Sequence, residues 1–129
     1  MTNKKIGNNF EQLLCEKLSE RGFWCHNLTQ NQAGQPADVI AVKDGKPYLI
    51  DCKVCKNNTF SFNRIEENQH NAMRLWKQSG NGEGWFALQL NDGSIYMICH
   101  SLMIALSLNQ SSINDELITH YGIALDKWA

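Results

Sequence analysis

Residues 34–55 read GQPADVIAVKDGKPYLIDCKVC and contain the strongest fold signal in the chain. Two apolar runs flank Asp44-Gly45, a pair that favours the type I′ turn of a tight β-hairpin, because both central residues of that turn need positive φ. With a two-residue loop, Lys43 and Lys46 become a hydrogen-bonded pair. The stretch therefore predicts two antiparallel strands in one defined register.

This register places two acidic residues opposite each other. The pair Val42–Pro47 is not hydrogen-bonded, which suits a residue that has no N–H. Asp38 and Asp51 also face each other at a non-hydrogen-bonded position, where Cα atoms approach to about 4.5 Å. Lys53 lies two residues further on and points to the same face as Asp51. Two carboxylates and an ammonium group are thus predicted to converge within apolar strands.

Facing carboxylates destabilise a sheet unless a cation neutralises them. Mg²⁺ is suited to this role because it binds one or two protein carboxylates together with waters and phosphate oxygens. The alternative is a solvated pair of strand-end aspartates with a surface lysine. The apolar flanks and the position of Pro47 favour the metal-site interpretation.

The composition is that of an ordinary globular protein. The chain has 129 residues, of which 43% are hydrophobic and 19% charged, which predicts one domain over residues 1–129. No apolar run approaches the roughly 20 residues of a membrane span. The first ten residues, MTNKKIGNNF, lack the apolar segment of a signal peptide. We therefore expect a cytoplasmic protein.

The five cysteines are odd in number and scattered, which predicts reduced thiols that pack as small apolar side chains. Cys52-x-x-Cys55 could instead form half of a zinc site or a redox pair. No second ligand pair stands at the spacing that zinc requires, however, and residues 52 and 55 of a strand point to opposite faces. Packing in the core is the favoured interpretation.

Charge is unevenly distributed along the chain. Residues 1–80 contain eleven Lys and Arg against eight Asp and Glu, whereas residues 81–129 contain one against five. A nucleic-acid partner would therefore meet the first part of the chain. The near-zero net charge by itself gives no support for such a partner.

An amphipathic helix is predicted over residues 8–21, where apolar residues recur at helical spacing. Asn8 or Asn9 can cap its start, and Gly22 suits the left-handed position after its end. Glu11 would then lie in the first turn. The simplest role for Glu11 is to complement the helix dipole.

A second long helix is predicted over residues 64–79. Asn63 can cap it, and Glu66 at the third helical position resembles a capping box. Gln69 falls on the apolar side of this helix and needs a hydrogen-bond partner there. That partner is either the backbone or the predicted acidic cluster.

The remaining apolar segments complete an α/β fold. Strands are predicted at residues 23–28, 85–90 and 94–100, and short helices at 101–108 and 114–121. Together with the hairpin these strands make a central mixed sheet of about five strands. The hairpin strands are apolar on both faces, which indicates that helices flank the sheet on both sides.

Phe60 and Phe62 alternate with small polar residues beside basic ones. Exposed aromatic side chains in such a setting can stack on nucleic-acid bases. They can equally be core or dimer contacts, and this second interpretation is favoured.

The order of these residues resembles that of the PD-(D/E)xK nuclease superfamily. Within it, the chain is similar to the Holliday junction resolvases of the RecU type and, more loosely, to the archaeal resolvases. The resemblance spans roughly residues 5–100 and rests on Gly7-x-x-Phe10-Glu11, Pro36-x-Asp38, Asp51-x-Lys53, Thr59-Phe60-Ser61-Phe62 and Gln69-His70.

The resemblance implies a restriction-endonuclease-like core and a Mg²⁺-dependent (or Mn²⁺-dependent), structure-selective DNA endonuclease that resolves Holliday junctions in recombination and repair. It implies that Asp38 and Asp51 bind the metal and that Glu11 completes the acidic cluster. Lys53 would orient or activate the attacking water, and Gln69 would support the site. The family usually has Glu at the position of Asp51.

The resemblance also implies four-way DNA junctions as partner and a homodimer, since symmetric cutting calls for two-fold symmetry. The chain is shorter than the bacterial cellular members and lacks their basic N-terminal extension, which suggests a phage or prophage version. The candidate DNA contacts are Lys4, Lys5, Lys56, Arg64, Phe60 and Phe62.

Two other functions stay open from the sequence. One is a nuclease of the same superfamily that acts on flap, nicked or linear duplex DNA. The other is a recombination accessory protein that binds DNA without cutting it.

Overall fold

A six-stranded mixed sheet forms the centre of the computed structural model, which describes residues 3–28 and 37–129, and for residues 3–8 the backbone alone. The strand order is β1-β2-β3-β5-β6-β8, and β3 and β5 are the parallel pair. A separate two-stranded sheet pairs β4 with β7. The strands are β1 (Trp24–Asn27), β2 (Val39–Lys43), β3 (Lys46–Val54), β4 (Phe60–Ser61), β5 (Trp85–Gln89), β6 (Ile95–Cys99), β7 (Ser112–Ile113) and β8 (Ile123–Ala124).

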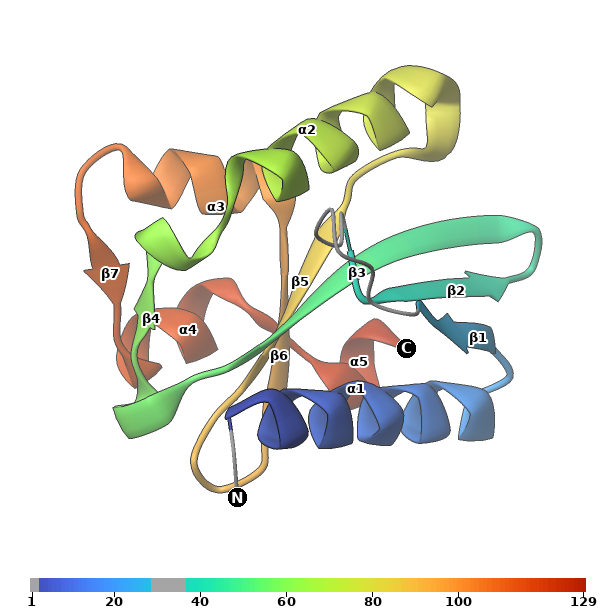
Figure 1. Ribbon diagram of the computed structural model, residues 1–129, viewed down its shortest axis with the longest axis horizontal. Helices are drawn as coiled ribbons and strands as arrows, with labels where there is room; N and C mark the ends of the chain where they lie inside the picture. The colour runs from blue at the N-terminus through green and yellow to red at the C-terminus, as the bar shows by residue number, and fades with distance from the viewer. Residues whose placement is uncertain (1–2, 29–36) are drawn as a thin grey trace.

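Helices cover both faces of the sheet, as the two-sided apolar strands predict (Figure 1). α1 and α5 contribute to the core on one face, and α2, α3 and α4 contribute to the core on the other. No helix among the described residues is long and apolar enough to cross a membrane. The helices are α1 (Asn3–Glu20), α2 (Glu67–Trp76), α3 (His100–Ser107), α4 (Asp115–Tyr121) and α5 (Leu125–Trp128).

The β2–β3 hairpin has the predicted turn and register. Asp44 and Gly45 form the loop with φ of 54° and 75°, and Lys43 pairs with Lys46. The ladder ends at Val39–Ile50, one residue before the predicted Asp38–Asp51 pair. The Asp38 N–H instead donates to the Ile50 carbonyl over 3.0 Å. Asp38 therefore lies at the strand entrance and is not a ladder partner of Asp51.

α1 begins earlier than predicted. It starts at Asn3, so Asn8 and Asn9 are not caps and Glu11 lies in the middle of the helix. The dipole of the first turn consequently does not account for Glu11. The end agrees with the prediction, since Gly22 has a φ of 90° and the Phe23 N–H donates to the Leu18 carbonyl, as in a Schellman motif.

α2 is shorter than the predicted helix of residues 64–79. Phe62–Arg64 form a single 3-10 turn, and Glu66 is the N-cap. The capping box therefore lies three residues later than predicted, with Gln69 at its third helical position. After Trp76 the chain passes into a π-type turn, Lys77–Asn81.

The C-terminal segment adds a strand that the sequence did not predict. β8 pairs with β6 and raises the count of the central sheet from about five to six. The segment of residues 114–121 is helical from Asp115, and the Asn114 side chain accepts a hydrogen bond from the Leu117 N–H over 3.1 Å. Trp128 then packs over the sheet, stacked on Phe23 at a centroid distance of 5.8 Å.

Candidate active site

The alternation of side chains along β3 presents the acidic and basic residues to α2. Leu49 packs in the core on the α2 side, whereas Ile50 and Cys52 pack on the α1 side. Asp51 and Lys53 share the face of Leu49, as the spacing predicts. Asp51 is only 1% exposed. Burying a carboxylate to this extent lowers the free energy of unfolding unless charged or polar groups interact with it.

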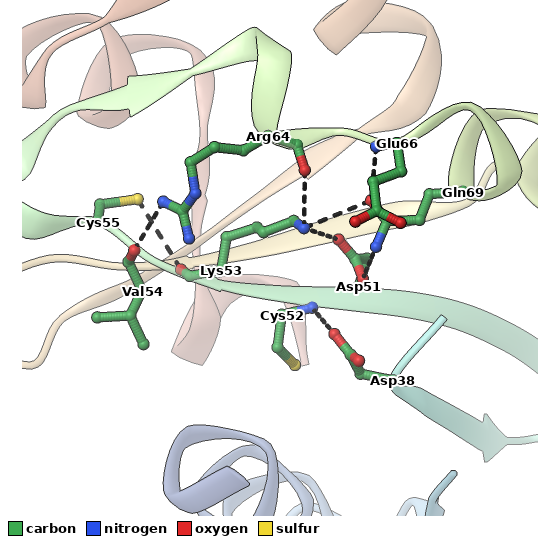
Figure 2. A network of polar contacts seen from close by, with 9 residues as sticks. All are labelled: Asp38, Asp51, Cys52, Lys53, Val54, Cys55, Arg64, Glu66 and Gln69. Atoms are coloured by element: carbon green, nitrogen blue, oxygen red, sulfur yellow. Dashed lines mark hydrogen bonds and ion pairs between the residues drawn. The ribbon is translucent and has the colours of Figure 1, made fainter. Parts of the chain in front are cut away.

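The ammonium group of Lys53 is held by oxygen atoms from three segments (Figure 2). Its Nζ lies 3.3 Å from Asp51 Oδ2. It donates to the Arg64 carbonyl over 3.0 Å and to Gln69 Oε1 over 3.4 Å. The Lys53 side chain is 13% exposed, so its positive charge is fixed in a largely desolvated position.

Gln69 connects the start of α2 to this cluster. Its Oε1 accepts from the Glu66 N–H over 3.0 Å, which is the capping-box contact. Its Nε2 donates to Asp51 Oδ1 over 3.3 Å. Both partners considered for this buried glutamine, the backbone and the acidic cluster, are therefore present.

Asp38 lies between two other carboxyl groups. Its Oδ2 accepts from the Cys52 N–H over 2.7 Å (Figure 2). Burial and then the Asp38 carboxylate raise the pKa of Glu11 to about 8. Burial and then Asp38 also raise the pKa of Asp51 well above its usual range, against the opposing effect of Lys53. Glu11, Asp38 and Asp51 thus form a row of acidic groups from α1 to β3.

The donor set fits a divalent cation held by two carboxylates. Asp51 Oδ2 is buried and accepts no hydrogen bond, although it makes the ion pair with Lys53, and the like charge of Asp38 acts on the Asp51 carboxylate. Among residues 3–28 and 37–129, no group of three or more His, Cys, Asp and Glu could hold a metal ion by itself. Asp38 and Asp51 would therefore hold the ion, with water and phosphate oxygens completing the shell, as Mg²⁺ favours.

The raised pKa of Glu11 predicts a pH-dependent stability for the metal-free protein. The ordinary pKa of a glutamate is 4.5, and the pKa of Glu11 in the folded protein is about 8. Between pH 4.5 and about pH 8, the folded state therefore binds more protons at Glu11 than the unfolded state does. The stabilising contribution of neutral Glu11 is therefore complete below pH 4.5 and is lost as the pH rises through about 8. Urea denaturation in EDTA across this range measures the effect.

The control for this experiment is Glu11→Gln. His70 and His100 have lowered pKa values because of burial and act in the opposite direction. Only the difference between the wild type and the variant is therefore informative. We expect the free energy of unfolding of the wild type, relative to Glu11→Gln, to fall with rising pH. A difference that does not change with pH would show that neither burial nor Asp38 raises the pKa of Glu11 in the folded protein.

The candidate DNA contacts do not form one group. Phe60 is 0% exposed within the core, which agrees with its favoured interpretation as a core contact and removes it from the candidate DNA contacts. Phe62 is half-buried and packs edge-to-face on Phe60. Lys56 and Arg64 are exposed, and the Arg64 guanidinium donates to the Val54 carbonyl over 2.8 Å. The side chains of Lys4 and Lys5, together with Pro36, lie outside the described residues.

The contacts that sequence reasoning missed involve backbone atoms. The Arg64 carbonyl holds Lys53, and the Cys52 N–H holds Asp38. Such groups occur in every residue and leave no signature in a sequence. Cys55 is buried in the core, in agreement with the favoured interpretation of the Cys52-x-x-Cys55 pair.

The fold is that of a known nuclease. The structure of Hjc from Archaeoglobus fulgidus, described as a Holliday junction resolvase from an archaeal hyperthermophile, matches with a TM-score of 0.74 and 16% sequence identity. The match covers 95% of this chain and 98% of that chain. The chain thus has a restriction-endonuclease-like fold.

The sequence defines the family within that fold. The family model "Archaeal holliday junction resolvase (hjc)" matches residues 2–126, and the chain belongs to this family. No curated protein matches the chain. The chain is accordingly an endonuclease of the junction-resolving class, which hydrolyses DNA phosphodiester bonds, and the family chemistry implies a divalent metal. The resemblance to the archaeal resolvases is confirmed.

Proposed function

We propose that the whole chain is a single nuclease domain that resolves four-way DNA junctions in recombination and repair, with Asp38, Asp51 and Lys53 as its catalytic centre. The observation that carries this proposal is the buried Asp51 carboxylate, whose Oδ2 makes an ion pair with the Lys53 ammonium at 3.3 Å and accepts no hydrogen bond. This is a charged, desolvated cluster in the second half of the central strand β3. A purely structural role would not require it.

Asp38 and Asp51 would hold Mg²⁺ or Mn²⁺, and Glu11 would complete the cluster beside Asp38. When bound, such an ion polarises a phosphate oxygen and lowers the pKa of a coordinated water. Asp38 is oriented for this role by the Cys52 N–H. Gln69 is a positioning residue, because it fixes Asp51 Oδ1 and contacts Lys53 from α2.

Lys53 would orient the attacking water and stabilise the negative charge that develops on the phosphate in the transition state. Fixed positive charges are most effective where water is excluded and no reorganisation is needed. The contacts to Asp51 and to the Arg64 carbonyl hold the ammonium group in place before any substrate binds.

DNA would be positioned by phosphate contacts from Lys4, Lys5, Lys56 and Arg64, which carry no sequence information. Arg64 is well placed because its own carbonyl binds Lys53. Paired cuts across a junction call for two sites related by a two-fold axis, so we propose a homodimer. Because its substrate is cellular DNA, the enzyme would act in the cytoplasm.

The test is cleavage of a labelled four-way junction and of a linear duplex with the same arm sequences, in Mg²⁺, in Mn²⁺ and in EDTA. We expect nicks in the junction only with a divalent ion, and cleavage of the duplex at least ~10-fold slower. Asp38→Asn should bind the junction without cutting it. Asp126→Asn, at an exposed position on α5, is the control that should cut normally.

The outcomes separate the alternatives. If a duplex, flap or nicked DNA is cut as fast as the junction, that DNA takes the place of the four-way junction as the proposed substrate. Cleavage that persists in EDTA would contradict the metal role of Asp38 and Asp51. Junction binding without any cleavage by the wild type would indicate an accessory protein.

A further inference from the structure

Two cysteines that the nuclease function does not use lie in contact with each other. Cys15 is on α1 and Cys25 is on the edge strand β1, and their Sγ atoms are 3.0 Å apart, with the Cys25 thiol donating to Cys15. Both side chains are half-buried, so each keeps some access to solvent. Cys52 packs against the same core and acts electrostatically on Cys25, but the short Sγ–Sγ contact among the described residues is the one between Cys15 and Cys25.

The contact gives the two sulfurs unequal roles. The hydrogen bond from Cys25 lowers the pKa of the Cys15 thiol, against the effect of burial, and the same bond raises the pKa of Cys25. Cys15 is therefore the better nucleophile, because the thiolate is the reactive form of cysteine. Cys25 is placed to react second, by attack on Cys15 Sγ, which lies 3.0 Å away.

We propose that Cys15 and Cys25 form a thiol–disulfide exchange site that takes a small disulfide, such as oxidised glutathione, as its oxidant. The Cys15 thiolate attacks one sulfur of the oxidant, the oxidant's S–S bond breaks, and one glutathione leaves and takes up a proton. Cys25 then loses its proton and attacks Cys15 Sγ, which forms the Cys15–Cys25 bond and releases the second glutathione. Two protein thiols are oxidised and one disulfide is reduced to two thiols.

The product would tie α1 to the edge of the sheet. Cys15 lies one helical turn after Glu11, so the bond would fasten the part of α1 that carries the acidic row to β1. A cross-link between residues this close in sequence restricts the unfolded chain and raises the melting temperature. This inference does not depend on the nuclease proposal.

The experiment treats the folded, reduced protein with oxidised glutathione. We expect two of the five thiols to disappear, the intact mass to fall by two hydrogens, and a peptide map to join Cys15 to Cys25. The melting temperature should rise by roughly 5–10 °C and return after treatment with dithiothreitol.

Three variants make the assignment specific. Cys25→Ser should stop the reaction at a stable adduct of one glutathione on Cys15, and Cys15→Ser should prevent the disulfide. Cys99→Ser should behave as the wild type. Oxidation that persists in Cys15→Ser, a bond that maps to Cys52, or five thiols that stay reduced in excess oxidant would each overturn the proposal.

Discussion

Asp51→Asn is expected to lower the rate of junction cleavage at least ~10³-fold without lowering the stability of the fold. The carboxylate is 1% exposed and its pKa is raised by burial and by Asp38, so its charge opposes folding. The amide is nearly the same size and can still accept from Gln69. Loss of the proposed metal ligand and of its charge is expected to remove about 4 kcal/mol or more of transition-state stabilisation.

Single-turnover cleavage and urea denaturation without metal measure the two halves of this prediction. Asp126→Asn makes the same chemical change at an exposed site and should leave both quantities near the wild type. If Asp51→Asn lost stability as well as activity, the carboxylate would be a structural element of β3, and its crowding by Asp38 would be of no consequence.

Lys53→Met is expected to lower cleavage by about 10²–10³-fold and to cost about 2–4 kcal/mol of stability. The substitution keeps the apolar stem but leaves Asp51 buried without the cation 3.3 Å away. In the Asp51→Asn background the same substitution should cost less than about 1 kcal/mol, because no buried charge is left unpaired. The two substitutions are therefore expected to be strongly non-additive.

A double-mutant cycle over the wild type, the two single variants and the double variant measures this coupling by urea denaturation. The carbonyl of Arg64 and the amide of Gln69 remain in all four proteins. Equal costs of Lys53→Met in both backgrounds would mean that the ammonium group is stabilised by these two oxygens and not by Asp51.

The sequence predicts the hairpin well because its information is local. Asp44-Gly45 fixes the turn, and the turn fixes the pairing of Lys43 with Lys46. The prediction fails at positions whose conformation depends on contacts beyond the neighbouring residues. Asp38 leaves the ladder to bind the Cys52 N–H, and α1 continues to Asn3 because residues that can cap a helix are also tolerated inside one.

Contacts between distant segments could not be predicted. Phe60 and Phe62 look alike in the sequence, but Phe60 pairs with Ile113 on β7 and is buried in the core, whereas Phe62 is half-buried. The Sγ contact between Cys15 and Cys25 likewise depends on how α1 lies along β1. The sequence indicates that Gln69 needs a partner, but its simultaneous contacts to Glu66 and Asp51 follow from the placement of α2.

The position of Gln69 couples the first turn of α2 to the proposed catalytic cluster. One side chain closes the helix start and fixes the orientation of Asp51. When that turn frays, the carboxylate loses a hydrogen bond and Lys53 loses one of its oxygens. The end of a helix is ordinarily among the least stable parts of a protein, and here its opening and closing would determine how often the cluster is assembled.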